Sequence, residues 1–206
     1  MLVTKITKKG NSILVVFDDV SSILLNYNVY IDSMLRKNDN VNEQFIEELK
    51  KKNEAYKIKY LALNLLGRRS HSKRELFQKL TKKGFDKVLI SKVLDDLSEI
   101  NYINDDDFAE KYAEEKIKKG KSGIIKIRAE LYKKGIDKSI IQKIEEKYND
   151  NNEMNDSIFV LASKKLESLN KKESDSRKIK SKLYSHLLGK GFTSEQIKDV
   201  FYKLDL

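Results

Sequence analysis

Two patterns of hydrophobic and polar positions divide the chain near residue 54. Before that point, β-branched and aromatic residues flank a glycine-containing turn at Lys8-Lys9-Gly10-Asn11, so residues 1–18 are predicted to form a β-hairpin. Ser21–Leu25 is expected to add a third strand. The spacing then predicts short helices at Val29–Leu35 and Val41–Leu49, packed on the hairpin because two strands alone are only marginally stable.

After residue 54 the apolar spacing is helical, and a motif repeats three times. Leucine or isoleucine stands eight and four residues before a glycine, and an apolar residue follows it. The glycines are Gly84, Gly135 and Gly191, which lie 51 and 56 residues apart. Two residues beyond each glycine stands a good N-cap residue: Asp86, Asp137 or Thr193. Each motif therefore predicts a helix ended by a left-handed glycine, followed by a corner and a capped second helix.

A third helix is expected before each of these pairs, at Ala55–Leu66, Asp105–Lys119 and Asn155–Leu169. The predicted fold is mainly α: a small N-terminal β-hairpin module and three tandem three-helix repeats in an elongated, curved array. Neighbouring repeats must stack, since none buries its apolar face alone. The expected domain boundaries are 1–53, 54–103, 104–152 and 153–206.

Composition narrows the chemistry that the chain can perform. It contains no Cys, which excludes disulfide frameworks, thiolate nucleophiles and cysteine-rich zinc modules. It also contains no Pro, which permits long uninterrupted helices. No P-loop, Rossmann glycine run or nucleophile elbow is present, so we expect no enzyme, no catalytic residue and no cofactor. Charges interrupt every candidate membrane span and the N-terminus lacks a signal-peptide pattern, so a cytoplasmic protein without membrane contact is expected.

Three polar features could suggest a metal or base-binding site. The run Asp105-Asp106-Asp107 is better explained as stabilising a helix N-terminus, because consecutive helical residues point in different directions. His71 and His186 are expected to be ordinary surface or boundary residues, so no metal site is predicted. The tyrosines at 102, 112, 132 and 184 could stack on exposed bases, but their apolar contexts favour helix packing.

Charge is distributed unevenly along the chain. The net charge is +10, and Lys, Asn and Ile are all abundant, which can reflect compositional drift. Yet residues 67–92 sum to +7, residues 95–115 to −8 and residues 116–134 to +7. One basic helix per repeat would place a basic stripe along the stacked array, which favours contact with nucleic acid or with a filament. The candidate binding residues are Arg68, Arg69, Lys73, Arg74, Lys79, Lys82, Lys83, Lys121, Lys126, Arg128, Lys133, Lys134, Arg177 and Lys178.

Arg68 and Arg69 admit two interpretations. They could contact phosphate or acidic groups of a partner. Alternatively, they could lie at the end of the preceding helix, where cations favour the helix dipole. The sequence leaves both open.

Four spaced segments resemble the RecX family of bacterial recombinase regulators: LGRRSHSKREL at 66–76, KGF at 83–85, YINDDDFA at 102–109 and SGIIKIRAELYKKGI at 122–136. The resemblance implies a non-enzymatic protein that binds the RecA recombinase filament in its groove, and we expect the protein to be a monomer. The resemblance further implies contact with single-stranded and double-stranded DNA, and inhibition of RecA in recombination, DNA repair and the SOS response. Two other functions remain open: a general nucleic-acid-binding helical repeat protein, and a protein–protein scaffold without DNA affinity.

Overall fold

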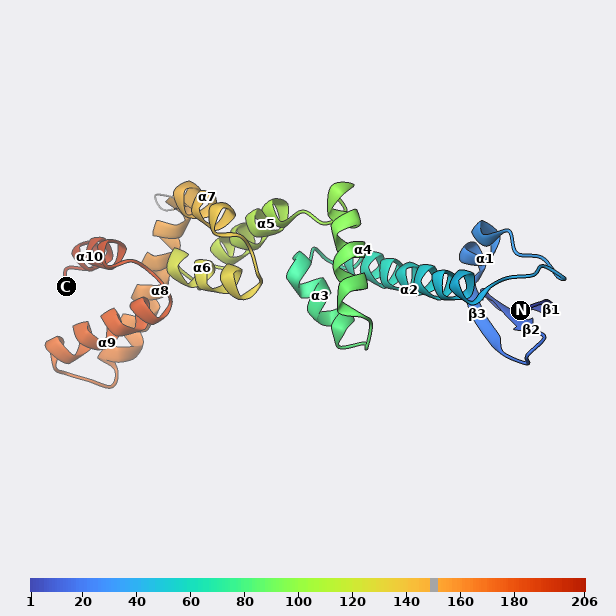
Figure 1. Cartoon of the computed structure of the whole chain (residues 1–206). Coiled ribbons are helices and arrows are strands. Elements are labelled where there is room, and N and C mark those ends of the chain that lie inside the picture. The colour runs from blue at the N-terminus through green and yellow to red at the C-terminus, as the bar shows by residue number, and fades with distance from the viewer. Residues whose placement is uncertain (149–151) are drawn as a thin grey trace. The chain divides into compact units, whose positions relative to one another are not determined.

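The computed structural model describes residues 1–148 and 152–206, which form three strands and ten helices (Figure 1). The chain divides into two compact units. The N-terminal unit comprises residues 1–70 and 76–103, and the C-terminal unit comprises residues 71–75 and 104–206. The division falls inside helix α3 (Lys73–Thr81), whose first turn belongs to the C-terminal unit.

The N-terminal unit begins with the predicted sheet. Strands β1 (Val3–Lys9), β2 (Ser12–Phe17) and β3 (Ser22–Asn26) form an antiparallel sheet in the order β1-β2-β3. Alternate residues of β2, including Val15 and Phe17, face a core that also takes in Leu25 of β3. The predicted hairpin and third strand are thus confirmed.

Two helices cover this sheet, and one of them corrects the sequence prediction. Helix α1 spans Tyr27–Ser33, and helix α2 runs without interruption over Glu43–Leu66. The helices expected at 41–49 and 55–66 are therefore one, and the expected domain boundary at 53 lies inside it. No glycine or proline separates the two segments, and Asn53 is buried at 6% exposure. Its side-chain amide accepts from the Asn26 backbone N–H (2.7 Å) and donates to the Leu24 carbonyl (3.1 Å), which joins the middle of α2 to β3.

The rest of the N-terminal unit is formed by the later part of α3 and by α4 (Lys87–Glu99). Ile58 and Ala62 of α2 share a core with Leu76 and Leu80 of α3 and with Leu94 of α4. This is the first three-helix repeat, whose leading helix is the second half of α2.

The C-terminal unit contains the second and third repeats. Its helices are α5 (Asp105–Lys118), α6 (Ile124–Lys133), α7 (Lys138–Tyr148), α8 (Asn152–Asn170), α9 (Ser176–Gly189) and α10 (Ser194–Lys203). One continuous core holds residues from both repeats, for example Ile127 and Leu131 with Ile158 and Leu187. The predicted fold class, a mainly helical chain with three tandem three-helix repeats, is confirmed.

The repeat corners have the predicted local geometry. Gly84, Gly135 and Gly191 have φ values of +87°, +77° and +85°. Asp86 accepts the Leu89 backbone N–H at 2.8 Å. Asp137 accepts the Ser139 N–H at 2.8 Å, and Thr193 forms a capping box with Gln196. The positive φ values explain why glycine recurs at these positions.

Within the C-terminal unit, the corner of one repeat packs on the start of the second helix of the repeat before it. At the start of α6, the Gly123 N–H donates to the Lys190 carbonyl (2.9 Å) and the Ile125 N–H donates to the Gly191 carbonyl (3.1 Å). A Cβ atom at Gly191 would lie only 2.4 Å from the Lys126 backbone nitrogen. The corner of the third repeat thus satisfies helix N–H groups that have no partner inside α6.

None of the helices in the described ranges is long and apolar enough to cross a membrane.

Candidate nucleic-acid interface

Five of the predicted basic residues of the first repeat lie in the N-terminal unit: Arg68, Arg69, Lys79, Lys82 and Lys83. Lys79 lies in the last turn of α3, whereas Lys82 and Lys83 follow the end of that helix, so the prediction that all three share one helix is wrong. All three side chains are exposed. Within the described part of the chain, none of the three forms an ion pair. Their charges are therefore available to a partner.

Arg68 and Arg69 are exposed just beyond the end of α2. The Arg68 N–H donates to the Leu65 carbonyl at 3.1 Å, and the Arg69 guanidinium donates to the Ser70 carbonyl at 2.8 Å. This position suits stabilisation of the helix dipole and also leaves the guanidinium groups accessible, so both interpretations of the sequence stay open.

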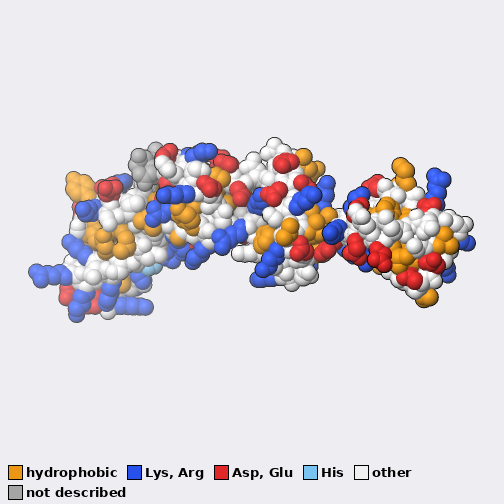
Figure 2. All heavy atoms as spheres, in the orientation of Figure 1, with side chains coloured by type: hydrophobic (Ala, Val, Ile, Leu, Met, Phe, Trp, Pro, Cys, Tyr) orange, Lys and Arg blue, Asp and Glu red, His pale blue; other side chains and the backbone are white. Residues whose placement is uncertain are grey.

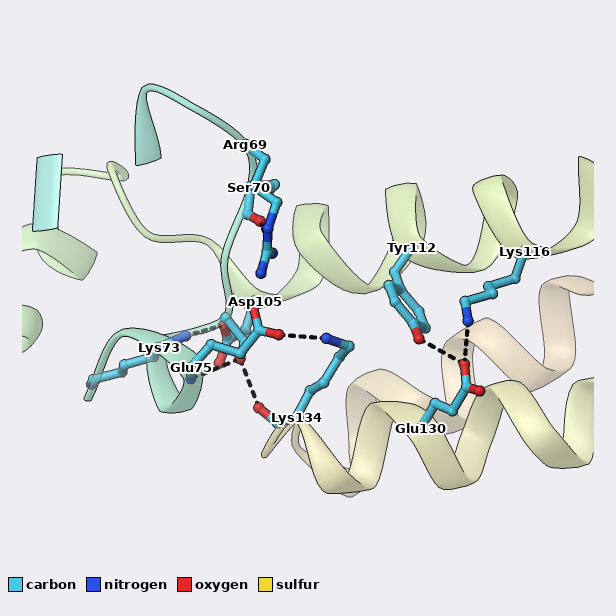
Figure 3. A network of polar contacts seen from close by, with 10 residues as sticks. Arg69, Ser70, Lys73, Glu75, Asp105, Tyr112, Lys116, Glu130 and Lys134 are labelled. Carbon is cyan, nitrogen blue, oxygen red and sulfur yellow. Dashed lines mark hydrogen bonds and ion pairs between the residues drawn. The ribbon is translucent and has the colours of Figure 1, made fainter. Parts of the chain in front are cut away.

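The start of α3 anchors to α5 and α6, as Figure 3 shows from close by. The Lys73 N–H donates to Asp105 at 2.9 Å, and the Ser72 hydroxyl donates to the Lys134 carbonyl at 2.7 Å. A Cβ atom at Gly135 would come within 2.2 Å of Cδ of Arg74. The backbone of Lys73 and the side-chain stem of Arg74 therefore take part in packing within the C-terminal unit.

Lys134 corrects the predicted stripe most clearly. Its ammonium pairs with Glu75, and both side chains are mostly buried, at 21% and 17% exposure. It also lies 5.5 Å from the ring centroid of Phe108 and 4.9 Å from that of Tyr112. These contacts hold Lys134 between the start of α3 and α5, so its ammonium does not lie on an open surface.

A second buried ion pair lies beside it in Figure 3. Glu130 accepts from the Tyr112 hydroxyl (2.6 Å) and pairs with Lys116 (2.7 Å). Burial and this hydrogen bond raise the pKa of Tyr112, and the bond to Glu130 raises the pKa of Lys116. Burial also raises the pKa of the nearby Asp105, against the opposing effect of Lys73. The charges of this network serve the contact between α5 and α6.

The remaining basic residues in and just before α6 differ in availability, and Lys121 precedes that helix. Arg128 pairs with Glu145 of α7 at 3.1 Å and stays partly exposed. Lys126 is half-buried against the corner at Gly191, whereas Lys121 and Lys133 are exposed. Lys121 and Lys133, rather than all five predicted residues, form the open part of this surface.

In the third repeat, Arg177 and Lys178 occupy the first turn of α9, and both are exposed. The Asp175 side chain caps this turn by accepting their backbone N–H groups at 2.9 and 3.4 Å. Cations at a helix N-terminus oppose the helix dipole, so helix stability does not explain these two side chains.

The acidic block contacts basic residues of the same unit. Asp107 pairs with Lys111 at 2.7 Å, Asp106 with Lys143 at 3.5 Å, and Glu110 with Lys147. Asn104 is the N-cap of α5, and the three aspartates occupy its first turn, as the dipole argument predicts. In the described residues, no cluster of three or more His, Asp or Glu side chains could hold a metal ion.

The two histidines occupy different environments. His71 is buried at 3% exposure, so its prediction as a surface or boundary residue is wrong. It directly precedes Ser72, which is also buried where α3 starts against the second repeat. His186 is half-buried as predicted, and burial together with Lys165 and Lys190 lowers its pKa.

The four tyrosines considered as base-stacking residues divide into two pairs. Tyr112 and Tyr184 pack partly buried against the core of the C-terminal unit, as their apolar contexts predict. Tyr102 and Tyr132 are 59% and 46% exposed.

Basic and acidic side chains alternate on the surface of both units. On the face drawn in Figure 2, Lys and Arg are interspersed with Asp and Glu over each unit.

Comparison with known proteins identifies the repeats. Models for the first, second and third three-helix domains of RecX match residues 59–97, 104–143 and 152–201. Regulatory protein RecX of Clostridium botulinum is 36% identical over 166 residues, which cover 81% of this chain and 77% of that protein. The chain belongs to the RecX family.

Other RecX proteins extend the match over nearly the whole chain. Regulatory protein RecX of Clostridium acetobutylicum is 31% identical over 198 residues, covering 96% of this chain and 92% of that one. A crystal structure of regulatory protein RecX superposes with a TM-score of 0.78 at 22% identity, over 96% and 98% of the two chains. RecX from Lactobacillus salivarius has a TM-score of 0.66 at 27% identity, over 74% and 97%. The RecX family is one of regulatory proteins.

Proposed function

We propose that this chain inhibits RecA recombinase by binding in the groove of its filament and contacting the DNA there. The observation that carries the proposal is the set of exposed basic side chains that folding does not use. They recur in each RecX repeat: Lys79, Lys82 and Lys83 in the first, Lys121 and Lys133 in the second, Arg177 and Lys178 in the third. In this proposal the chain acts without catalysis, as a cytoplasmic monomer, in recombination, DNA repair and the SOS response.

The chemistry of these side chains suits a phosphate backbone. Lysine binds phosphate as a point charge and lacks the planar fork with which arginine reads a base edge. Six of the seven residues are lysines, so we expect contact with DNA of any sequence. Sequence-independent recognition is what a regulator needs if it must act wherever a filament forms.

A triple and a double substitution test the basic groups. Replacing Lys79, Lys82 and Lys83 with glutamine, or Lys121 and Lys133 in a second variant, should weaken DNA binding and leave helicity intact. Each lost phosphate contact should reduce the slope of log K against log salt concentration by about 0.9 on duplex DNA and about 0.7 on single strands. A salt titration by fluorescence anisotropy measures this slope.

The matched control replaces three lysines that pair with carboxylates on their own helices: Lys50, Lys111 and Lys119. It removes the same amount of charge as the triple substitution, from other places. An equal loss of affinity in the control would show that only total charge matters, and it would refute the assignment of these sites.

A general nucleic-acid-binding protein is the second candidate. The observation in its favour is that the available basic residues occur in all three repeats, which requires no protein partner. It predicts the same salt-dependent DNA affinity with and without RecA. A protein–protein scaffold instead predicts no DNA affinity even at low salt.

A further inference from the structure

A pocket of about 440 Å³ lies inside the N-terminal unit. The β1–β2 turn forms one side, the start of α1 the second and the middle of α2 the third. Its lining contains three tyrosines, Tyr27, Tyr56 and Tyr60, and two lysines, Lys8 and Lys57. Asparagine and glycine supply the rest.

Two of the three tyrosines present aromatic surface to the pocket, whereas Tyr56 packs partly against the core. Tyr27 is 43% exposed and Tyr60 is 59% exposed. Tyr56 lies one helical turn before Tyr60, so the two share a face of α2. The Tyr56 hydroxyl accepts a hydrogen bond from the side-chain amide of Asn28 (2.6 Å), which joins the α1 and α2 sides of the pocket. Exposed rings in a concave site are suited to stacking on a flat ligand.

The charge of the pocket is entirely positive. Lys8 and Lys57 are its charged lining residues, whereas residues 1–50 as a whole have a net charge of −1. The Lys8 ammonium lies 5.5 Å from the centroid of the Tyr27 ring. A neighbouring groove of the same unit carries both signs, with Asp32 and Asp96 beside Lys52. The positive pocket therefore favours an anion joined to an aromatic group.

We propose that this pocket binds one or two unpaired nucleotides of a single-stranded nucleic acid. A base stacks on Tyr27 or Tyr60, and the phosphates on either side contact Lys8 and Lys57. Duplex DNA does not fit this chemistry, because its base faces are covered by neighbouring base pairs. The site joins the N-terminal sheet and α1 to α2, with Tyr60 inside the first RecX repeat. It does not depend on RecA, so it goes beyond the function proposed above.

The test uses the full chain with fluorescein-labelled (dT)12, (rU)12 and a 12-base-pair duplex, in separate titrations. Tyr27→Leu and Tyr60→Leu should each weaken binding of the single strands by about tenfold, which is within the range for removing one stacking partner. The corresponding Phe variants keep the ring and should stay within about twofold of the wild type. Lys57→Gln should reduce the single-strand salt slope by about 0.7. If the variants weaken binding of (dT)12 and (rU)12 similarly, the pocket binds both DNA and RNA. If they weaken binding of only one, the pocket binds that type of nucleic acid.

Tyr202→Leu is the matched control, because Tyr202 is 86% exposed in α10 and far along the chain from the pocket. It should leave all three titrations unchanged, and circular dichroism checks that the variants fold. The proposal is overturned if the Leu variants bind single strands normally, if the duplex loses as much affinity, or if Phe is as harmful as Leu. It is also overturned if an acidic phosphopeptide competes with (dT)12 at equal affinity. Since none of these titrations contains RecA, failure here leaves the filament proposal untouched.

Discussion

Replacing Gly191 with alanine should lower the melting temperature of the C-terminal unit by about 10 °C. Two effects add at this position. A residue with a side chain costs about 1–2 kcal/mol at the left-handed φ of +85°. The new Cβ would also lie 2.4 Å from the Lys126 backbone nitrogen, and overpacking of this kind costs about 1–3 kcal/mol. In a unit of this size, each kcal/mol of lost stability lowers the melting temperature by several degrees. A loss of about 3 kcal/mol therefore corresponds to about 10 °C.

Two further glycines separate these effects. Gly84→Ala tests the backbone conformation alone, because φ is +87° but no atom lies within 4 Å of the new Cβ. Gly123→Ala tests the clash alone, because φ is −82° and the Cβ would lie 2.3 Å from the Gly191 carbonyl oxygen. Each should lower the melting temperature of its own unit by less than Gly191→Ala lowers that of the C-terminal unit. Equal shifts for all three would contradict the packing of the Gly191 corner on α6.

Gly135→Val should destabilise the fold by more than the roughly 1 kcal/mol of helix propensity, because a β-branched residue is poor at a φ of +77°. The clash at this corner involves the Arg74 side chain, which is flexible, so the effect should stay below that of Gly191→Val. An unchanged melting temperature would refute the corner assignment.

Reversing the acidic block should separate RecA modulation from DNA binding. We expect Asp106, Asp107, Glu110 and Glu114, all changed to lysine, to maintain or raise affinity for naked DNA by up to about tenfold at low salt, because the acidic segment repels phosphate. The same variant should impair modulation of RecA, since a groove lined by protein and DNA can use both signs of charge. Equal gains in the DNA-binding and RecA assays would favour general DNA binding.

The ion pairs of α5 require a control for this experiment. The reversal breaks the pairs of Asp106 with Lys143 and of Glu110 with Lys147, which are about half exposed or more and contribute little to stability. Exchanging both pairs, with lysine at 106 and 110 and glutamate at 143 and 147, keeps the net charge and the pairing. If this exchange and the full reversal reduce both activities equally, the carboxylates act through the fold.

Local signals made the repeats predictable. The left-handed glycines and the N-caps at Asp86, Asp137 and Thr193 depend on residues within a few positions of each other, and all were found by spacing. The joining of two expected helices into α2 was missed because the tie from Asn53 to β3 spans 29 residues. A buried asparagine in a lysine-rich run looks like an ordinary exposed residue in the sequence.

The candidate site was harder to predict than the fold, because availability of a charge depends on distant partners. Lys133 and Lys134 are neighbours in the sequence, yet Lys133 is exposed while Lys134 pairs with Glu75, 59 residues earlier. The pocket of the N-terminal unit had one local signal, Tyr56 and Tyr60 one turn apart on either side of Lys57. Its third tyrosine, Tyr27, belongs to another helix, which the spacing does not indicate.

The central claim is most directly tested by the ATPase rate and filament length of RecA on single-stranded DNA as increasing amounts of this protein are added. We predict that the ATPase rate falls and that filaments shorten, and that the Lys79, Lys82 and Lys83 triple variant requires a higher concentration for the same effect. The account would be contradicted if the ATPase rate and the filament length stay unchanged at protein concentrations that bind the same DNA.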